Sequence, residues 1–249
     1  MRLKNKVAVV TGASRGIGKT IAKAYAREGA KVVVTARTEK PEDSKVPGTI
    51  HDTVRQIREA GGEATAIRCD ISQESSVNDM VRQAVDAYGP IDILVNNAGV
   101  RVDNFVWDVP LKRWELLMRV NFWGPVYAVR AVVPSMIERR TGNIINITSH
   151  GATGRSPKNT IYGTTKAALD RMTIGLATEV KQYGIAVNSM GPGLVVTEGA
   201  LLFSPGKSSW AGWDDVEIVA EPAVWLAMQT AETYSGNVVH APDYRKLWP

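Results

Sequence analysis

The sequence predicts an α/β fold in which one doubly wound, seven-stranded parallel sheet carries helices on both faces. Three observations support this prediction. Seven short apolar segments alternate with amphipathic helical patterns, a glycine-rich turn joins the first strand to the first helix, and no repeat or linker interrupts the rhythm. A chain of 249 residues is long enough to hold such a sheet. We therefore expect a single domain over residues 1–249.

The seven predicted strands are short and almost uniformly apolar, as strands buried on both faces are. The first, Val7-Ala8-Val9-Val10, is followed directly by Thr11-Gly12. The strands are expected at residues 7–10, 31–36, 64–69, 91–95, 143–148, 185–190 and 237–240.

The predicted helices lie between these strands and supply the crossovers that parallel pairing needs. Thr49 and Asp52 have capping-box spacing, and Gly29 is placed to end the first helix. Pro125 and Pro134 are expected to bend the longest helix. The helices are expected at residues 16–28, 49–60, 74–87, 111–139, 160–182 and 219–228.

Composition excludes several classes of protein. With Cys69 as the lone cysteine, no disulfide can form within the chain and no cysteine-based zinc site is expected. A reducing, cytoplasmic location fits. We expect no metal site. We also expect no membrane span and no signal peptide, because no apolar run is long enough. The net charge of +5 is spread along the chain, so no nucleic-acid partner is expected.

The turn after the first strand reads Thr11-Gly12-Ala13-Ser14-Arg15-Gly16-Ile17-Gly18. Open parallel sheets bind ligands at the carboxyl ends of their strands. A glycine-rich turn that opens a helix there lets backbone N–H groups approach a pyrophosphate. We expect Gly12, Ser14, Arg15, Gly16, Ile17 and Gly18 to bind a dinucleotide, although the glycine spacing differs from the common G-x-G-x-x-G.

The end of the second strand favours NADP(H) over NAD(H). It reads Thr35-Ala36-Arg37-Thr38 and lacks the acidic residue that usually binds the ribose 2′-hydroxyl of NAD. Arg37, with Arg15 from the glycine loop, is suited to a 2′-phosphate. Three acidic residues nearby, Glu39, Glu42 and Asp43, argue in the other direction. The long loop 38–48 either covers the adenosine end or has no role.

Polar residues follow the third and fourth strands. Asp70 and Ile71 are candidates for the adenine edge, although Asp70 is equally suited to a turn. The small residues of Asn96-Asn97-Ala98-Gly99 would let a cofactor lie close to the backbone, while the asparagines can tie strands together.

The fifth strand is followed by Ser149, and Tyr162 and Lys166 stand four residues apart on the next helix. That spacing places both side chains on one helical face. A Tyr-x-x-x-Lys pattern alone is most often a surface pair. On the helix after a strand that ends in Ser149, and behind a nucleotide fingerprint, the pattern is much less typical of a surface pair.

Together these motifs make the chain resemble the short-chain dehydrogenase/reductase family, from Lys6 to about Val239. The resemblance is carried by Thr11-Gly12-x-x-x-Gly16-x-Gly18, Asp70, Asn96-Asn97-Ala98-Gly99, Asn121, Ser149, Tyr162, Lys166 and Pro192-Gly193-x-x-x-Thr197. It implies a Rossmann-like sheet and a catalytic set of Asn121, Ser149, Tyr162 and Lys166. Cofactor contacts would come from the residues named above and from Asn97, Ala98, Gly99, Tyr162, Lys166, Pro192, Gly193, Val195 and Thr197.

The resemblance implies that a secondary alcohol and a ketone are interconverted by hydride transfer, with Tyr162 as acid and base. A tyrosine pKa near ~10 would have to fall to about 7 for this work, which requires roughly 4 kcal/mol. Lys166 and the oxidised nicotinamide would favour the phenolate. Ser149 would bind the substrate oxygen, and Asn121 would hold a water that connects Lys166 to solvent.

The segment 194–215 is expected to form a lid over the substrate. If its apolar residues face the pocket, the substrate carbonyl compound is hydrophobic; otherwise they pack on the sheet or on another subunit. These residues are Leu201, Leu202, Phe203, Trp210 and Trp213. Three further residues, Arg101, Val102 and His150, are expected to border the pocket or to be structural.

Two expectations concern assembly and the terminus. In this family the helices around Asn121 and Tyr162 commonly form a subunit interface, so a homodimer or homotetramer is expected. The chain ends differently from the family's usual Asp-Gly-Gly-like segment, with Val239-His240-Ala241-Pro242-Asp243. The alternative function is a non-catalytic NADP-sensing regulator. Such proteins usually lack the tyrosine or the lysine that this chain keeps as Tyr162 and Lys166. Sugar-nucleotide epimerases usually carry a further domain.

Overall fold

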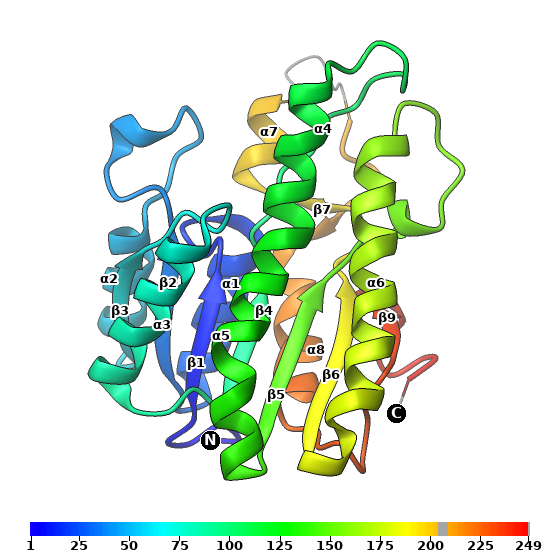
Figure 1. Ribbon diagram of the computed structural model, residues 1–249. Helices are drawn as coiled ribbons and strands as arrows, with labels where there is room; N and C mark the ends of the chain where they lie inside the picture. The colour runs from blue at the N-terminus through cyan, green and yellow to red at the C-terminus, as the bar shows by residue number, and fades with distance from the viewer. Residues whose placement is uncertain (204–208, 249) are drawn as a thin grey trace.

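The computed structural model describes residues 1–203 and 209–248 and contains the expected sheet (Figure 1). All neighbouring strands pair in parallel, which confirms the doubly wound, seven-stranded prediction. In spatial order the strands are β3 (Glu63–Arg68), β2 (Lys31–Ala36), β1 (Val7–Thr11), β4 (Ile93–Asn96), β5 (Gly142–Ile147), β6 (Ile185–Gly191) and β9 (Val238–His240). The strand order reverses between β1 and β4, and ligand sites of open sheets lie at such a switch point.

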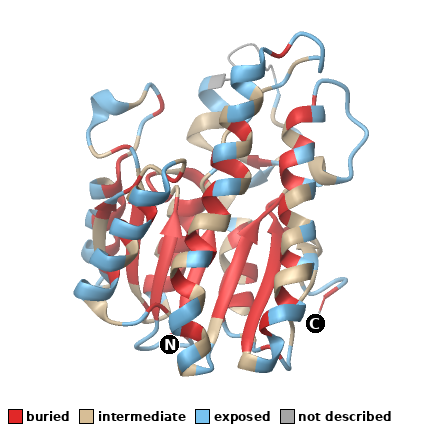
Figure 2. Cartoon of the chain, viewed as in Figure 1, coloured by how far each residue is buried: buried red, intermediate tan, exposed pale blue. Residues whose placement is uncertain are grey.

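Two layers of helices bury the two faces of the sheet (Figure 2). Ala8 and Val10 of β1 pack into the core on one face, whereas Val7 and Val9 pack into the core on the other, as the alternation of a strand requires. The first face is covered by α1 (Gly16–Arg27), α2 (Ile50–Glu59) and α8 (Ala220–Ala227), the second by α3 (Glu74–Tyr88), α5 (Gly124–Arg139) and α6 (Thr160–Val180).

The long helix expected over residues 111–139 is divided. A helix α4 (Leu111–Met118) is joined to α5 by a π-helical turn over Arg119–Trp123. Pro125, at the start of α5, has no N–H to donate to the carbonyl of Asn121 four residues earlier, so the α-helical bonding cannot continue unbroken there. Pro134 lies inside α5. The interruption therefore falls just before the first proline, at the residue that the family resemblance singles out.

The segment expected to be a lid contains elements that the sequence pattern did not predict. A two-stranded parallel pair joins β7 (Val195–Val196) to β8 (Asp214–Asp215), and a short helix α7 (Glu198–Phe203) follows β7. Strands of two residues are too short to show a hydrophobic period. Residues 204–208 of the expected lid lie outside the described part of the chain.

The altered C-terminus folds back onto α8. Trp248 is 5% exposed and packs in edge-on contacts against Trp225 and Tyr244, and its indole N–H donates to the carbonyl oxygen of His240 at 3.1 Å. This aromatic cluster closes the end of the sheet near β9. None of the helices in the described ranges combines the length and apolarity that crossing a bilayer needs.

Candidate active site

The glycine loop after β1 is fastened to the end of β4 by Asn97. Its side-chain amide donates to the carbonyl oxygens of Thr11 at 2.8 Å and Gly12 at 3.1 Å, and the Thr11 hydroxyl accepts the backbone N–H of Asn97 at 3.0 Å. A Cβ on Gly18 would lie 2.4 Å from the Asn97 amide nitrogen. The close approach of α1 to the end of β4 therefore requires glycine at position 18. The prediction that the asparagine ties neighbouring strands together is confirmed.

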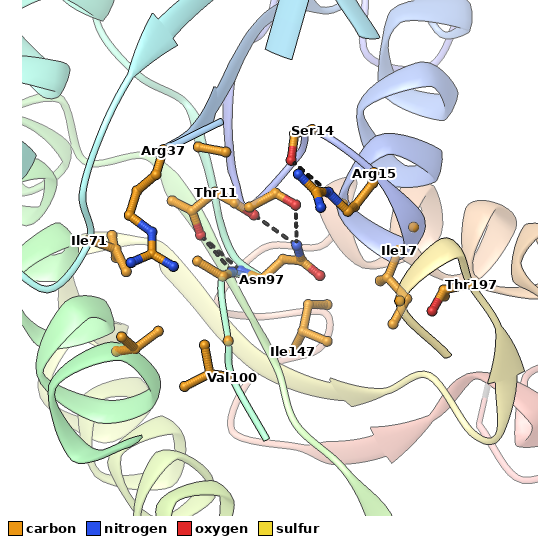
Figure 3. A pocket seen from close by; sticks show the side chains of 18 of the residues that line it. Thr11, Ser14, Arg15, Ile17, Arg37, Ile71, Asn97, Val100, Ile147 and Thr197 are labelled. Carbon is orange, nitrogen blue, oxygen red and sulfur yellow. Dashed lines mark hydrogen bonds between the residues drawn. The ribbon is translucent and has the colours of Figure 1, made fainter. Parts of the chain in front are cut away.

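A cavity of about 510 Å³ opens at the carboxyl ends of the central strands (Figure 3). It brings together most of the residues that the sequence indicated. The predicted residues on its wall are Gly12, Ser14, Arg15, Gly16, Ile17, Gly18, Arg37, Ile71, Asn97, Ala98, Gly99, Tyr162, Lys166, Pro192 and Thr197.

Three predicted cofactor residues do not line this cavity: Asp70, Gly193 and Val195. The Asp70 carboxylate accepts from the backbone N–H and the hydroxyl of Ser72, at 3.0 and 2.8 Å, so it forms a turn. Gly193 has a φ of +82° against Pro242, and the side chain of Val195 is buried. For Asp70, the turn interpretation is the one the structure shows.

The two arginines expected to share one phosphate have different environments. Arg37 is exposed, extends into the cavity beside Ile71 (Figure 3), and makes no hydrogen bond or ion pair with the rest of the described chain. Its guanidinium is thus available to an anion.

Arg15 instead holds the loop 38–48 against the glycine loop. Its guanidinium donates to the hydroxyls of Thr38 and Ser44, at 2.9 and 2.8 Å, and to the carbonyl oxygens of Val46 and Gly48, at 2.6 and 3.0 Å. Burial lowers the pKa of Arg15, which remains a cation. Thr38, Ser44 and Val46 also line the cavity, so the loop forms part of its wall.

The acidic residues of this loop turn away from the cavity. Glu39 faces Arg68 and His51 at 3.5 and 3.8 Å, and Asp43 accepts the backbone N–H groups of Glu39 and Lys40 at 2.9 and 3.0 Å. Glu42 is exposed and does not line the cavity either. The objection that these carboxylates raised against a 2′-phosphate is therefore removed by the geometry.

Glu198, which the sequence analysis did not single out, stands at the N-terminus of α1. Its carboxylate accepts the backbone N–H of Gly16 at 2.9 Å and forms an ion pair with Lys19. Burial by itself raises the pKa of Glu198, but the bonds from Lys19 and Gly16 outweigh it and the net pKa is lowered. A carboxylate thus occupies the position where a helix N-terminus binds anions.

Of the predicted catalytic residues, Tyr162 and Lys166 of α6 line the cavity, whereas Asn121 and Ser149 do not. The Lys166 ammonium lies 5.8 Å from the centre of the Tyr162 ring and donates to the carbonyl oxygen of Ile147 at 2.6 Å. Ser149, just past the end of β5, accepts the backbone N–H of Gly151 at 3.0 Å and lies close enough to Tyr162 to act on its pKa. The spacing of four residues on α6 therefore places the tyrosine and the lysine together, as expected.

Burial dominates the electrostatics of this group. It raises the pKa of Tyr162 above its ordinary value, although the hydrogen bond with Ser149 and the charge of Arg101 act in the opposite direction. Burial also lowers the pKa of Lys166 to about 8, against the attraction of Asp170. The lowering of the tyrosine pKa expected from Lys166 is thus not supplied by the protein alone, because desolvation penalises both charged forms.

Asn121, on the π-helical turn, clamps the backbone of Val100. Its side-chain oxygen accepts the N–H of Val100 at 2.8 Å, and its amide donates to the carbonyl oxygen of Val100 at 2.9 Å and to the Thr165 hydroxyl at 3.0 Å. This clamping was not foreseen. The expected water would have to bind the Asn121 backbone carbonyl, which Pro125 leaves without its α-helical donor.

Four described apolar residues of the expected lid, Leu201, Leu202, Trp210 and Trp213, do not line the cavity. Leu201 and Leu202 are 52% and 42% exposed, and Trp210 packs edge-on against Trp213 at 4.8 Å. The position of the Phe203 side chain lies outside what the structure describes. His150 stacks on His240, with ring centres 3.7 Å apart, and Arg101 lines the cavity.

Residues 6–203 match the family model described as short chain dehydrogenase. The chain belongs to this family. An uncharacterized oxidoreductase of Staphylococcus saprophyticus is 34% identical over 97% of this chain and 99% of that protein. The short-chain dehydrogenase fold is shared with a metagenomic short-chain oxidoreductase in complex with NADP, at a TM-score of 0.80, 30% identity, and coverage of 96% and 98% of the two chains.

A second solved structure of similar fold is a gluconate 5-dehydrogenase from Burkholderia cenocepacia in complex with NADP and tartrate. It superposes at a TM-score of 0.83, with 31% identity over 96% of this chain and 94% of that one. The protein is thus an oxidoreductase of the short-chain dehydrogenase family.

Proposed function

We propose that the protein interconverts a secondary alcohol and a ketone with NADP(H) as the hydride carrier, and that Tyr162 is the acid and base. The observation that carries the proposal is that Tyr162 and Lys166 line the same cavity as the glycine loop and the unpaired Arg37, with Ser149 next to Tyr162. When bound, the reduced cofactor supplies the hydride. The two solved relatives named above contain NADP, which supports the same cofactor here.

The residues present fit a dinucleotide phosphate. Gly12, Gly16 and Gly18 line the cavity and carry no side chain, so the backbone of the loop is accessible to a ligand. Glu198 holds the N–H of Gly16, and the N-terminus of α1 offers its remaining N–H donors to a pyrophosphate. Arg37 offers an unpaired guanidinium to a 2′-phosphate.

In the proposed reaction, the chain's own residues orient the carbonyl and move one proton. The hydroxyls of Tyr162 and Ser149 would both hydrogen-bond the substrate oxygen, and Tyr162 would donate its proton as the oxygen becomes an alkoxide. Because the pKa of Tyr162 is raised, its hydroxyl is neutral near pH 7 and ready to donate. Lys166 would hold the cofactor ribose and favour the phenolate that remains.

The reaction itself is tested by a panel of ketones and secondary alcohols, followed at the absorbance of the reduced cofactor with NADPH and NADH in parallel. We expect consumption of NADPH by at least one ketone and a lower rate with NADH. Consumption of neither cofactor across a broad panel would favour a sensing role.

Arg37→Gln should weaken NADPH binding by about 10–100-fold, because a charge-assisted contact to the 2′-phosphate is lost. NADH binding should change little. Titration of each cofactor, followed by calorimetry, measures both constants. Lys40→Gln, an exposed change on the same loop, is the matched control. An equal loss for NADH and NADPH would contradict the 2′-phosphate assignment.

Glu198→Gln should tighten NADPH binding by about 10-fold. The wild-type carboxylate holds the Gly16 N–H and places a negative charge at the α1 N-terminus, and a neutral amide would repel a pyrophosphate less. Fluorescence titration of the ligand-free protein measures the change, with the exposed Glu217→Gln as control. Weaker binding in the Glu198 variant would mean that this carboxylate helps to hold the cofactor.

A further inference from the structure

The cavity wall is cationic. Four cationic side chains, Arg15, Arg37, Arg101 and Lys166, line it, whereas no Asp or Glu is found among the described residues of the wall. Arg15 is engaged by the loop 38–48, Arg37 is placed for a 2′-phosphate, and Lys166 is buried beside Tyr162. Arg101 is the cation that the proposed cofactor contacts leave without a role.

Arg101 is directed at the reaction site by a buried clamp. It follows Val100, whose N–H and carbonyl oxygen are both held by the fully buried Asn121 at 2.8 and 2.9 Å. Val100 and Tyr162 also pack against the same small apolar cluster, of which Leu117 is a member. The carbon of the Arg101 guanidinium lies 5.3 Å from the centre of the Tyr162 ring. The cation therefore stands over the residue proposed to bind the substrate carbonyl.

The guanidinium keeps most of its hydrogen-bonding capacity. Its Nε donates to the two carboxylate oxygens of Asp103, at 2.8 and 3.0 Å, and its Nη groups make no hydrogen bond with the described residues. A guanidinium carries five N–H donors in a fixed fork. The Asp103 pair is more than half exposed on both sides, so it neutralises the charge weakly while fixing one edge of the fork.

The phosphate groups of the proposed cofactor do not account for this cation. The elements suited to phosphates are the glycine loop after β1 and Arg37 after β2, whereas Arg101 follows β4 and faces Tyr162. A fork with two unused Nη groups beside a reacting carbonyl matches one ligand chemistry closely, namely a planar carboxylate bound through two parallel hydrogen bonds.

We propose that Arg101 binds a carboxylate of the substrate, so that the enzyme acts on oxo acids and the corresponding hydroxy acids rather than on neutral ketones. This inference rests on the proposed function. The carbonyl carbon receives the hydride and its oxygen receives the proton of Tyr162, which gives a hydroxy acid and the oxidised cofactor. The carboxylate is unchanged and stays on Arg101. Because the guanidinium lies over the Tyr162 ring, the carboxylate stands within a few bonds of the reacting carbon.

The test compares pyruvate, acetoacetate and levulinate with their methyl esters, using NADPH and the wild-type, Arg101→Gln and Arg101→Lys proteins. For at least one chain length we expect the wild-type kcat/KM to favour the acid by about 10–100-fold, the effect of a charge-assisted bidentate contact. Arg101→Gln should remove this preference by raising KM for the acid, with the ester little affected. Arg101→Lys should restore it in part, because the charge returns without the fork.

Two controls separate the possible outcomes. Arg113→Gln, an exposed change on α4, should leave the acid preference intact, and the NADPH Kd should be unaltered in all variants. Reduction of the esters as fast as the acids by the wild-type protein would overturn the inference while leaving the proposed function standing.

If no compound is reduced, the proposed function fails, and direct binding decides the role of Arg101. Calorimetric titration of levulinate into the NADPH-saturated protein should then show about 10-fold tighter binding to wild type than to Arg101→Gln. Equal binding to the two proteins would overturn the carboxylate assignment.

Discussion

Replacing Tyr162 with Phe is expected to reduce turnover by about 10²–10⁴-fold, the contribution of a positioned proton donor. The ring remains and fills the same space, so the NADPH Kd and the melting temperature should stay close to wild type. Only the hydroxyl that Ser149 contacts is removed. Single-turnover reduction of a ketone with bound NADPH measures the loss without interference from product release.

The pH dependence of the wild-type reaction rate is a second test of the role of Tyr162. Since burial raises the pKa of Tyr162, the protonated form persists above the ordinary tyrosine range, and ketone reduction should be insensitive to pH near neutrality. Reduction should slow, and alcohol oxidation should accelerate, as the pH rises towards that pKa. The Phe variant should lack both trends at the Tyr162 pKa and keep only the decline that follows the loss of the Lys166 charge above about pH 8. Turnover near wild type in this variant would remove Tyr162 from the mechanism, and Tyr183→Phe serves as the matched control.

Replacing Lys166 with Met is expected to lower turnover by about 10²–10³-fold, because the preorganised cation that favours the Tyr162 phenolate is lost. Methionine has nearly the same length, so the space behind Tyr162 remains filled. NADPH binding should weaken as well, since Lys166 is proposed to hold the ribose. The rate and the Kd are measured separately, and the exposed Lys181→Met is the control.

The Lys166→Met variant should also differ from wild type in the pH dependence of its free energy of unfolding. Lys166 has a pKa of about 8 in the folded protein, below its ordinary 10.5. The unfolded chain therefore binds more protons between these values, and the wild-type free energy of unfolding should rise with pH in this window, relative to Lys166→Met. The full gain is on the order of 3 kcal/mol. Denaturant unfolding at about pH 7 and 10 measures it, and a pH-independent difference between the two proteins would contradict the buried-lysine interpretation.

Much of the fold was predictable because its signals are local. The strands β1 and β2 are short apolar runs, the capping box of Thr49 and Asp52 marks the start of α2, and both appear in the structure as expected. For the long helix, the sequence predicted a bend at Pro125, whereas the structure has a π-helical turn just before it. Its cause, a proline four residues after Asn121, was visible in the sequence, but a missing hydrogen bond does not say whether a helix kinks or adopts a π-turn.

The contacts that distinguish this site are long-range, and no spacing in the sequence reports them. Glu198 meets Gly16 across 182 positions of the chain, and Asn121 meets Val100 across 21. The sequence did not distinguish the roles of Arg15 and Arg37. The structure shows that the guanidinium of Arg15 is hydrogen-bonded to the loop 38–48, whereas that of Arg37 has no partner in the described chain. A side chain's partners depend on which strand ends the sheet brings together.

By itself, the sequence determined the parallel sheet, the glycine loop and the shared helical face of Tyr162 and Lys166, because each depends on the residue period within one element. Only the tertiary structure decided the charge states around them. Burial raises the pKa of Tyr162 and lowers that of Lys166, and it depends on how β5, α6 and the cavity wall pack together. The position of Arg101 also depends on the packed fold, which places its guanidinium over the Tyr162 ring.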